Sequence, residues 1–462
     1  MNPISTEAID TLKANTHGEV VLPGDPNYDE VRSIWNAMID RRPGAILRCA
    51  GVEDVVAAVN TAREHGLLVS VRGGGHNIAG NSLCNGGLTI DLSEMKAVRV
   101  DAGARIAYVE PGATLADVDA ASQAHGLATS LGINSTTGVA GLTLGGGFGW
   151  LTRKYGMTVD NLLAADVVTA DGRQLRASAD QNPELFWALR GGGGNFGIVT
   201  GFEFRLHPVG PEVLSGLIVY PYAQARTVLE QYREYAKTLP DEMTVWAVLR
   251  KAPPLPFLPE AAHGQTAVVL AFLYTGDVEE GRPLIEPARH FGDSYGEFVG
   301  THSFAAWQQA FDPLLTPGAR NYWKSHNLAE LSDGALGTVI EYAGSLPSPQ
   351  CEIFIAQLGG AANRVAVDAT AYPHRNTAFV LNVHGRWDDA AQDQTGVGWS
   401  REFFQAATPY AQGGVYVNFL TEEETARVGA AYGPGYARLV EVKKRYDPQN
   451  FFRLNQNIQP AA

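Results

Sequence analysis

Val71-Arg72-Gly73-Gly74-Gly75-His76-Asn77 is the stretch that decides how this chain is interpreted. Its three consecutive glycines let the backbone approach a flat, phosphate-bearing ligand and adopt φ values that other residues avoid. The imidazole of His76 follows directly, and neutral imidazole is a nucleophile near neutral pH. For an isolated Gly-Gly-Gly-His the simpler interpretation is a histidine that closes a turn. Other segments of the chain are therefore needed to distinguish a ligand site from a simple turn.

Composition restricts the possible functions. The 462 residues, 45% of them hydrophobic, can bury the cores of two or three domains. A net charge of -14 argues against a nucleic-acid partner, which needs clustered Lys and Arg. No signal-like N-terminus and no apolar run of about 20 residues is present, so we expect a cytoplasmic protein without a membrane partner. Cys49, Cys84 and Cys351 lack metal-ligand spacing, so neither disulfides nor a metal site is expected.

The N-terminal half alternates predicted helices and strands around the glycine turn. Apolar residues at helical spacing predict a helix over residues 54–65, and Gly66 suits its end. Thr114 and Asp117 form a capping-box pattern that opens another helix, ending at Gly126. Strands are expected at residues 67–71, 88–92 and 105–109.

Two further glycine-rich segments accompany the turn. Residues 131–149, LGINSTTGVAGLTLGGGFG, leave little side-chain bulk on one wall, so a planar ring or a pyrophosphate could lie there against backbone N–H groups. Residues 191–197, GGGGNFG, contain a formal GxGxxG, but a predicted helix precedes it and a predicted strand follows it. A dinucleotide fingerprint has the opposite order, which argues against a nicotinamide site. A packed loop explains one glycine cluster; it does not easily explain three.

Together with YDPQNFFRLNQN at residues 446–457, these segments resemble the berberine bridge enzyme-like FAD-linked oxidases of the vanillyl-alcohol oxidase superfamily. The motifs RGGGHN, GGGFGWLTRKYG, RGGGGNFGIVT and DPxNFFRxNQNI carry the resemblance over nearly the whole chain. It implies an α+β fold with a two-lobed PCMH-type FAD-binding domain, formed by residues 1–210 and 411–462. A substrate domain at residues 211–410 lies between, as an antiparallel sheet covered by helices.

The composition of the middle region agrees with that division. The glycine clusters stop at about Glu212, and apolar runs predict strands at residues 243–249, 266–274, 352–358 and 378–385, with an amphipathic helix at residues 222–239. The proline-rich piece at residues 253–259 is expected to be a surface loop, since prolines lack ladder donors.

The resemblance implies FAD bound covalently through His76, by attack of the imidazole on the C8-methyl of the flavin. In doubly linked members a cysteine lies four residues before the glycine that matches Gly138; here that position is Asn134, so a single bond is expected. The residues assigned to the cofactor are Arg72, Gly73, Gly74, Gly75, His76, Asn77, Gly80, Asn134, Thr136, Thr137, Gly138, Gly141, Leu142, Gly147, Gly197, Val199, Asn455 and Asn457.

Candidate catalytic residues lie in three places. Tyr416 and Asn418 match the family's YxN segment. We expect this segment to be a strand that projects both side chains toward the flavin. Nearby cations would make the Tyr416 phenol more acidic, so that it can take a proton from the substrate. Tyr322 and Lys324, two apart on another expected strand, are candidates for a pocket wall, where Lys324 would acidify a phenol or orient an anion. Thr137 matches a position beside N5, where a hydroxyl could hydrogen-bond a bound oxygen atom or simply pack.

The expected function is oxidation of a small organic substrate, an alcohol, amine, sugar or aromatic metabolite, by hydride transfer to N5. Dioxygen then reoxidises the flavin and gives H2O2. Two alternatives stay open: oxygenation or multi-step oxidation of an aromatic or polyketide-like metabolite through an N5-oxygen adduct, and a non-catalytic flavin-binding protein. The partners expected are the substrate and O2; the sequence names neither the substrate nor the oligomeric state.

Overall fold

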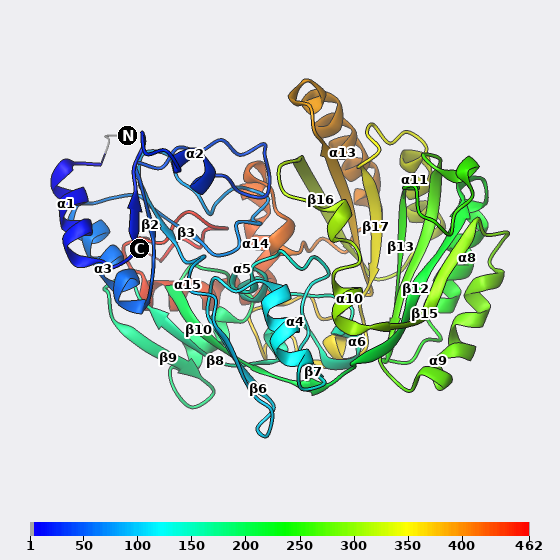
Figure 1. The fold of residues 1–462 in the computed structure, drawn as a ribbon, viewed down its shortest axis with the longest axis horizontal. Coiled ribbons are helices and arrows are strands. Elements are labelled where there is room, and N and C mark those ends of the chain that lie inside the picture. Colours follow the sequence, from blue (N-terminus) through cyan, green and yellow to red (C-terminus); the bar gives the residue numbers. More distant parts are fainter. Residues whose placement is uncertain (1–3, 462) are drawn as a thin grey trace.

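Two groups of sheets lie side by side in the computed structural model, which describes residues 4–461 (Figure 1). The N-terminal strands form one group with the C-terminal helices, and the middle of the chain forms a large sheet beside them (Figure 1). Within residues 4–461, no helix has the combined length and apolar character that crossing a bilayer requires.

The glycine turn is held by a four-stranded sheet of order β1-β2-β4-β3, in which β2, β4 and β3 are parallel. β4 is buried along its whole length, because helix α3 covers one face with Val55, Ala58, Val59 and Ala62. The strands are β1 (Glu19–Val21), β2 (Ala45–Arg48), β3 (Val69–Arg72) and β4 (Leu88–Asp91), and α3 spans Val52–Glu64. β3 therefore delivers the chain directly into Gly73.

The second sheet is antiparallel, with the order β5-β6-β10-β8-β9. Its strands are β5 (Val98–Asp101), β6 (Ile106–Val109), β8 (Leu162–Val168), β9 (Gln174–Ser178) and β10 (Ile198–Arg205). The predicted capping box is present, since Thr114 and Asp117 exchange hydrogen bonds at the start of α4 (Leu115–Gln123). Helix α7 (Pro183–Leu189) precedes the third glycine cluster and β10 follows it, which confirms the inverted order.

The middle of the chain forms a seven-stranded antiparallel sheet of order β15-β12-β14-β13-β17-β18-β16. Its strands are β12 (Glu212–Pro221), β13 (Met243–Lys251), β14 (Thr266–Tyr274), β15 (Gly296–Ser303), β16 (Arg320–Leu328), β17 (Glu352–Gln357) and β18 (Phe379–Trp387). Both faces are covered, so β14 is a continuous apolar run. Val268, Leu270 and Phe272 join the helix-covered core, whereas Ala271 and Leu273 pack on the opposite face.

Helices cover one face of this sheet, with α8, α9 and α11 on its outer side in Figure 1. The α-helices not yet given bounds are α1 (Thr6–Asn15), α2 (Tyr28–Val31), α5 (Val139–Leu144), α6 (Thr152–Tyr155), α8 (Ala225–Ala236), α9 (Val278–Ile285), α10 (Phe304–Gln308), α11 (Asp333–Ala343), α12 (Ala361–Arg364), α13 (Asp393–Ala407), α14 (Val428–Tyr432) and α15 (Tyr436–Tyr446). A two-stranded pair, β7 (Leu127–Ala128) with β11 (His207–Pro208), completes the strands among the described residues.

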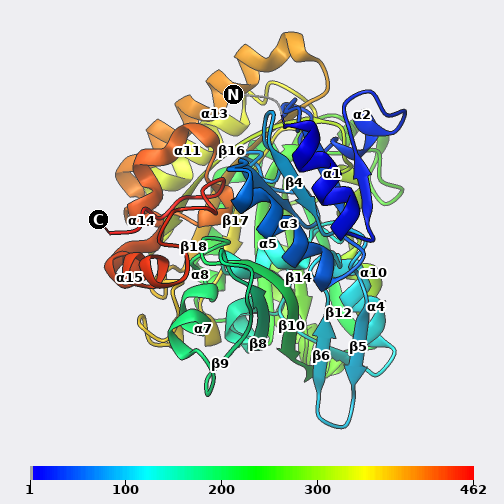
Figure 2. The ribbon, with the colours of Figure 1, turned by 90° about the vertical axis from the view of Figure 1, so that its left-hand side faces the viewer.

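The C-terminal segment returns to the N-terminal sheets, where α15 lies beside α7 (Figure 2) and α14 packs in the same hydrophobic core. The fully buried Lys443 ammonium donates hydrogen bonds to the Asn195 carbonyl oxygen at 2.8 Å and to Asp447 at 2.6 Å. Asn195 in turn accepts a hydrogen bond from the Ile458 backbone N–H at 3.0 Å. The third glycine cluster and the C-terminal motif therefore fasten each other. The division at residues 210 and 410 into domains stays a prediction.

Two local expectations need correction. Residues 414–419 do not form a strand: Val417–Phe419 is a 3-10 turn closed by a hydrogen bond from Phe419 N to Tyr416 O at 3.0 Å. No neighbouring strand pairs with this segment among the described residues, so alternation does not apply. The proline-rich piece at residues 253–259 is a loop without strand pairing, as expected, but only in part a surface loop, because Leu258 is buried and packs in a small core with Val219 and Val269.

Candidate active site

Two glycine-rich segments touch through their backbones at the attachment turn. A Cβ built on Gly74 would lie 2.4 Å from the backbone nitrogen of Gly138, and one on Gly138 would lie 2.4 Å from that of Gly74. Neither position can therefore accept a side chain without moving the other segment. Gly75 has a φ of +70°, in the left-handed region that favours glycine, and it turns the chain so that His76 follows at the cavity wall.

The His76 ring is held through one of its two nitrogens. Nε2 lies 3.0 Å from Oγ1 of Thr136, and that hydroxyl donates to Oδ1 of Asn134 at 2.8 Å. The Asn134 oxygen also accepts the Thr136 backbone N–H at 3.1 Å, which fixes the orientation of its amide. With its own hydrogen donated to Asn134, the Thr136 hydroxyl accepts from His76. The ring hydrogen is thus on Nε2, and Nδ1 carries the lone pair.

The surroundings of His76 keep its ring neutral and in place. Burial lowers the pKa of His76 to about 4, so the imidazole is uncharged at neutral pH. The indole of Trp35 stacks on it with ring centroids 5.0 Å apart, and the Trp35 Nε1 donates to the Leu315 carbonyl oxygen at 2.8 Å. A neutral, oriented imidazole with a free lone pair is a competent nucleophile.

A cavity of about 410 Å³ lies between the glycine segments and the seven-stranded sheet. The predicted cofactor residues that line it are Gly73, Gly74, Gly75, His76, Asn77, Asn134, Thr137, Gly138, Gly141, Leu142, Gly197, Val199 and Asn455. All three glycine clusters and the C-terminal motif therefore contribute to one cavity. Its glycine-rich part can approach a flat ligand closely and offers backbone N–H groups to a pyrophosphate.

Five predicted cofactor residues lie outside the cavity wall: Arg72, Gly80, Thr136, Gly147 and Asn457. Arg72 donates instead to the Val31 carbonyl oxygen, and the Gly80 carbonyl accepts from Arg41 at 2.8 Å. Thr136 and Gly147 contribute indirectly: Thr136 hydrogen-bonds to His76 and Gly147 to Tyr416, and both of these partners line the cavity. Asn457 has a buried side-chain oxygen without a hydrogen-bond partner.

Tyr416 and Asn418 meet at the cavity wall although their segment is a turn. The Tyr416 phenol oxygen accepts hydrogen bonds from the Gly147 backbone N–H and from the Asn418 side-chain nitrogen, both at 3.0 Å. Burial raises the pKa of Tyr416 to about 12, so the expectation of a phenol made acidic by cations is wrong. Both lone pairs of the phenol oxygen are engaged, and its O–H remains to donate.

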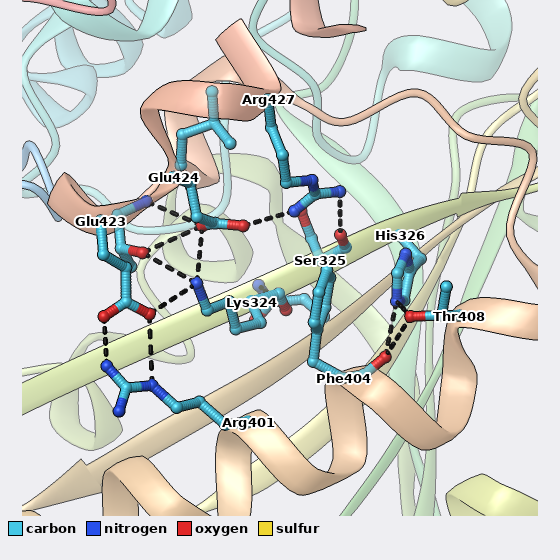
Figure 3. Close-up of polar contacts among 12 residues, drawn as sticks. Lys324, Ser325, His326, Arg401, Phe404, Thr408, Glu423, Glu424 and Arg427 are labelled. Atoms are coloured by element: carbon cyan, nitrogen blue, oxygen red, sulfur yellow. Dashed lines mark hydrogen bonds and ion pairs between the residues drawn. The ribbon is translucent and has the colours of Figure 1, made fainter.

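Tyr322 and Lys324 do not line the cavity, and the expectation that they form a pocket wall is wrong. Lys324 lies 2.9 Å from a Glu423 carboxylate oxygen and 3.2 Å from one of Glu424 (Figure 3). Tyr322 donates to Glu423, and burial together with that carboxylate raises the pKa of Tyr322. Strand β16 turns these side chains away from the cavity and turns Trp323 toward it. The ion pairs fasten residues 421–427, which directly follow the Tyr416 turn.

The seven-stranded sheet supplies cavity residues that the sequence interpretation missed. We name this set the sheet wall: Leu217, Val219, Trp246, Val248, Arg250, Val269, Ala271, Trp323, Glu352, Phe354 and His384. Because β14 and β18 are buried on both faces, hydrophobic alternation gave no signal of which face borders the cavity. Thr137 lines the opposite side, beside Gly138, and its role stays a prediction.

Glycine-rich loops around a held histidine, opening onto a cavity with a phenol and an aromatic wall, define an FAD-binding oxidoreductase. A family described as FAD binding domain matches residues 43–178, and one described as berberine and berberine like matches residues 415–459. A FAD-linked oxidoreductase of Dictyostelium discoideum is 31% identical, with 99% of this chain and 98% of that protein covered. The chain belongs to the berberine bridge enzyme-like FAD-linked oxidoreductases.

Two solved structures show the same fold. The crystal structure of 6-hydroxy-D-nicotine oxidase from Arthrobacter nicotinovorans has a TM-score of 0.85 at 28% identity, covering 96% of this chain and 98% of the other. Glucooligosaccharide oxidase from Acremonium strictum, described with a 6-S-cysteinyl, 8α-N1-histidyl FAD, has a TM-score of 0.86 at 23% identity, covering 98% and 99%. The second likeness concerns the fold alone.

Proposed function

We propose that this protein is an oxidase that holds FAD by a single covalent bond to His76 and oxidises a small organic substrate with O2. The observation that carries the proposal is the hydrogen-bonded state of His76. Thr136 and Asn134 fix the ring hydrogen on Nε2, and the free lone pair is therefore on Nδ1. Nδ1 is the atom from which we propose the bond to the flavin C8-methyl.

The residues present fit FAD. A planar ring can lie against Gly74 and Gly138 because neither residue has a side chain, and the close contact of the two backbones prevents either position from acquiring one. Bound FAD would supply an electrophilic C8-methyl carbon to Nδ1; the methyl proton would be lost to solvent, and the two electrons would pass to O2. The positive charge that develops on the imidazole is stabilised by Thr136 Oγ1, which Asn134 polarises. Asn134 stands where a cysteine would make a second bond, and its short amide cannot form a thioether.

The chemistry that FAD supplies when bound is acceptance of a hydride at N5 and delivery of the electrons to O2, which gives H2O2. The protein supplies orientation. Tyr416, kept neutral by burial and oriented by the hydrogen bonds from Gly147 and Asn418, offers its O–H to a substrate oxygen or nitrogen. Phe148 and Phe419 meet the Tyr416 ring edge-on, each with centroids 4.9 Å away, and exclude water from that position.

Turnover tests this function. Purified yellow protein should consume O2 and release H2O2 with at least one member of a panel of alcohols, amines, sugars and hydroxylated aromatic compounds. Anaerobic addition of the same compound should bleach the flavin absorbance. Failure of every compound to bleach it would favour a flavin-binding protein without catalysis.

A further inference from the structure

Polar side chains of the sheet wall gather at one place. Of its eleven residues, Arg250, Glu352 and His384 are polar, and the other eight are aromatic or aliphatic. Arg250 Nη1 donates to a Glu352 carboxylate oxygen at 2.7 Å, and the other Glu352 oxygen lies 3.4 Å from His384 Nδ1. The side chains of Glu352 and His384 are 12% and 3% exposed, so this is a buried polar cluster within an apolar wall.

The two groups that face each other are both proton acceptors. His384 Nε2 lies 3.0 Å from Asn321 Oδ1, and the Asn321 amide is oriented because its nitrogen donates to the Ala319 carbonyl oxygen at 2.7 Å. The His384 ring hydrogen is therefore on Nε2. Burial lowers the pKa of His384 although the neighbouring Glu352 raises it, and the pKa of Glu352 is low despite burial because Arg250 and, to a lesser extent, His384 act on it. A carboxylate oxygen and an imidazole lone pair thus converge at the cavity wall.

Charge decides which donor suits this acceptor pair. The charged groups that act on His384 are Glu352, Arg386 and Arg250, two cations and one anion. An ammonium group would add a third positive charge to a buried apolar site, and its desolvation would not be compensated. A neutral hydroxyl has one hydrogen, which it can donate to either acceptor or share between them without that penalty.

We infer that the substrate is a largely apolar aromatic compound whose hydroxyl group donates to the Glu352–His384 acceptor pair. The aromatic part suits the rest of the cavity, where the Trp150 and Trp246 rings stack with centroids 4.8 Å apart and Trp246 stacks with Phe354 at 6.1 Å. The same wall disfavours a saccharide, because its eight apolar residues offer no hydrogen-bond partners to the hydroxyls that would face them. This inference rests on the proposed function, of which it names the substrate class.

Binding of matched probes tests the inference independently of turnover. Anaerobic spectral titration of the flavin-loaded protein gives dissociation constants for para-phenylphenol, its methyl ether, para-phenylbenzylamine and cellobiose. We expect para-phenylphenol to bind about tenfold or more tightly than the ether, which cannot donate, and more tightly than the amine or the sugar. Equal binding of the phenol and its ether, or tighter binding of the amine or of cellobiose, would overturn it.

Variants assign the preference to the acceptor pair. Glu352→Gln leaves the Arg250 charge unpaired, so the double variant Arg250→Met with Glu352→Leu, which removes both charges, provides the second test. The double variant leaves the His384 lone pair as the one remaining acceptor of the pair, so the advantage of the phenol over its ether should fall from about tenfold to about threefold or less. Phe354→Leu, on the same strand, is the matched control and should weaken both probes without changing their ratio. A preference for the phenol that is undiminished in the double variant would contradict the assignment.

Measuring the covalent flavin content of each sample separates this inference from the proposed function. Samples with fully attached flavin and no preference for the phenol refute the substrate class alone. Samples without attached flavin refute the proposed attachment, whatever the probes show.

Discussion

Oγ1 of Thr136 lies 3.0 Å from Nε2 of His76 and donates a hydrogen bond to Oδ1 of Asn134. Thr136→Val removes the acceptor while keeping the side-chain shape. We expect covalent attachment of FAD to the apoprotein to slow by about tenfold, the effect of losing one hydrogen bond to a group that becomes charged. The measurement is the flavin fluorescence retained by denatured protein over time. Thr136→Ser, which keeps the hydroxyl, is the control, and an unchanged rate in Thr136→Val would show that the ring needs no such partner.

The pH dependence of covalent flavin attachment should reflect the low pKa of His76. The nucleophile is the neutral ring, and burial lowers the pKa of His76 to about 4. The rate of attachment should therefore be constant from neutral pH down to about pH 5 and fall only as the pH approaches 4, whereas an ordinary imidazole would lose half its rate near pH 6.5. Circular dichroism at each pH checks that the apoprotein stays folded. A midpoint near 6.5 would contradict a half-buried ring whose surroundings lower its pKa.

Tyr416→Phe tests the phenol donor. Its loss should lower kcat by about a hundredfold, as for removal of one oriented donor at a reacting group, while the flavin stays attached. Tyr372→Phe is the matched control, because the Tyr372 hydroxyl is buried without a partner and its ring lies 6.4 Å from that of Tyr416. We expect this control to keep its activity. Equal losses in both variants would mean that the effect comes from packing.

The Lys443–Asp447 pair should be important for stability. Both side chains are fully buried, and Lys443 also donates to the Asn195 and Phe452 carbonyl oxygens. Lys443→Met leaves the Asp447 charge unpaired and should lower the free energy of unfolding by about 3–5 kcal/mol. The exposed pair of Arg438 with Glu184 is the comparison, where Arg438→Met should cost less than about 1 kcal/mol. Denaturant unfolding of the two variants measures the difference, and similar costs would contradict it.

The sequence predicted the elements whose signals are local. The Thr114–Asp117 capping box and the helix before the third glycine cluster needed only neighbouring residues, and both are present. The family resemblance predicted the FAD-binding fold and assigned the glycine turn and residues 131–149 to one cofactor. The backbone contact between these two segments was not predicted, since contacts between distant segments have no local signal.

The errors concern side-chain partners that are distant in sequence. Lys324 pairs with Glu423 and Glu424, about a hundred residues away, so the carboxylates that balance its charge could not be inferred from the strand that contains it. The Tyr416 turn lacks a neighbouring strand, which its sequence does not reveal. Glu352 and His384 come together because β17 pairs with β18, in a register that places them opposite each other.

The mass of the intact, denatured protein is the most direct test of the central claim, that His76 holds the flavin. Fully loaded wild-type protein should show the polypeptide mass plus one FAD, and peptide mapping should place the addition on the segment that contains His76. His76→Ala should show the bare polypeptide mass and release its flavin on acid precipitation. A bare mass for the loaded wild-type protein, or an addition that persists in His76→Ala, would contradict the account.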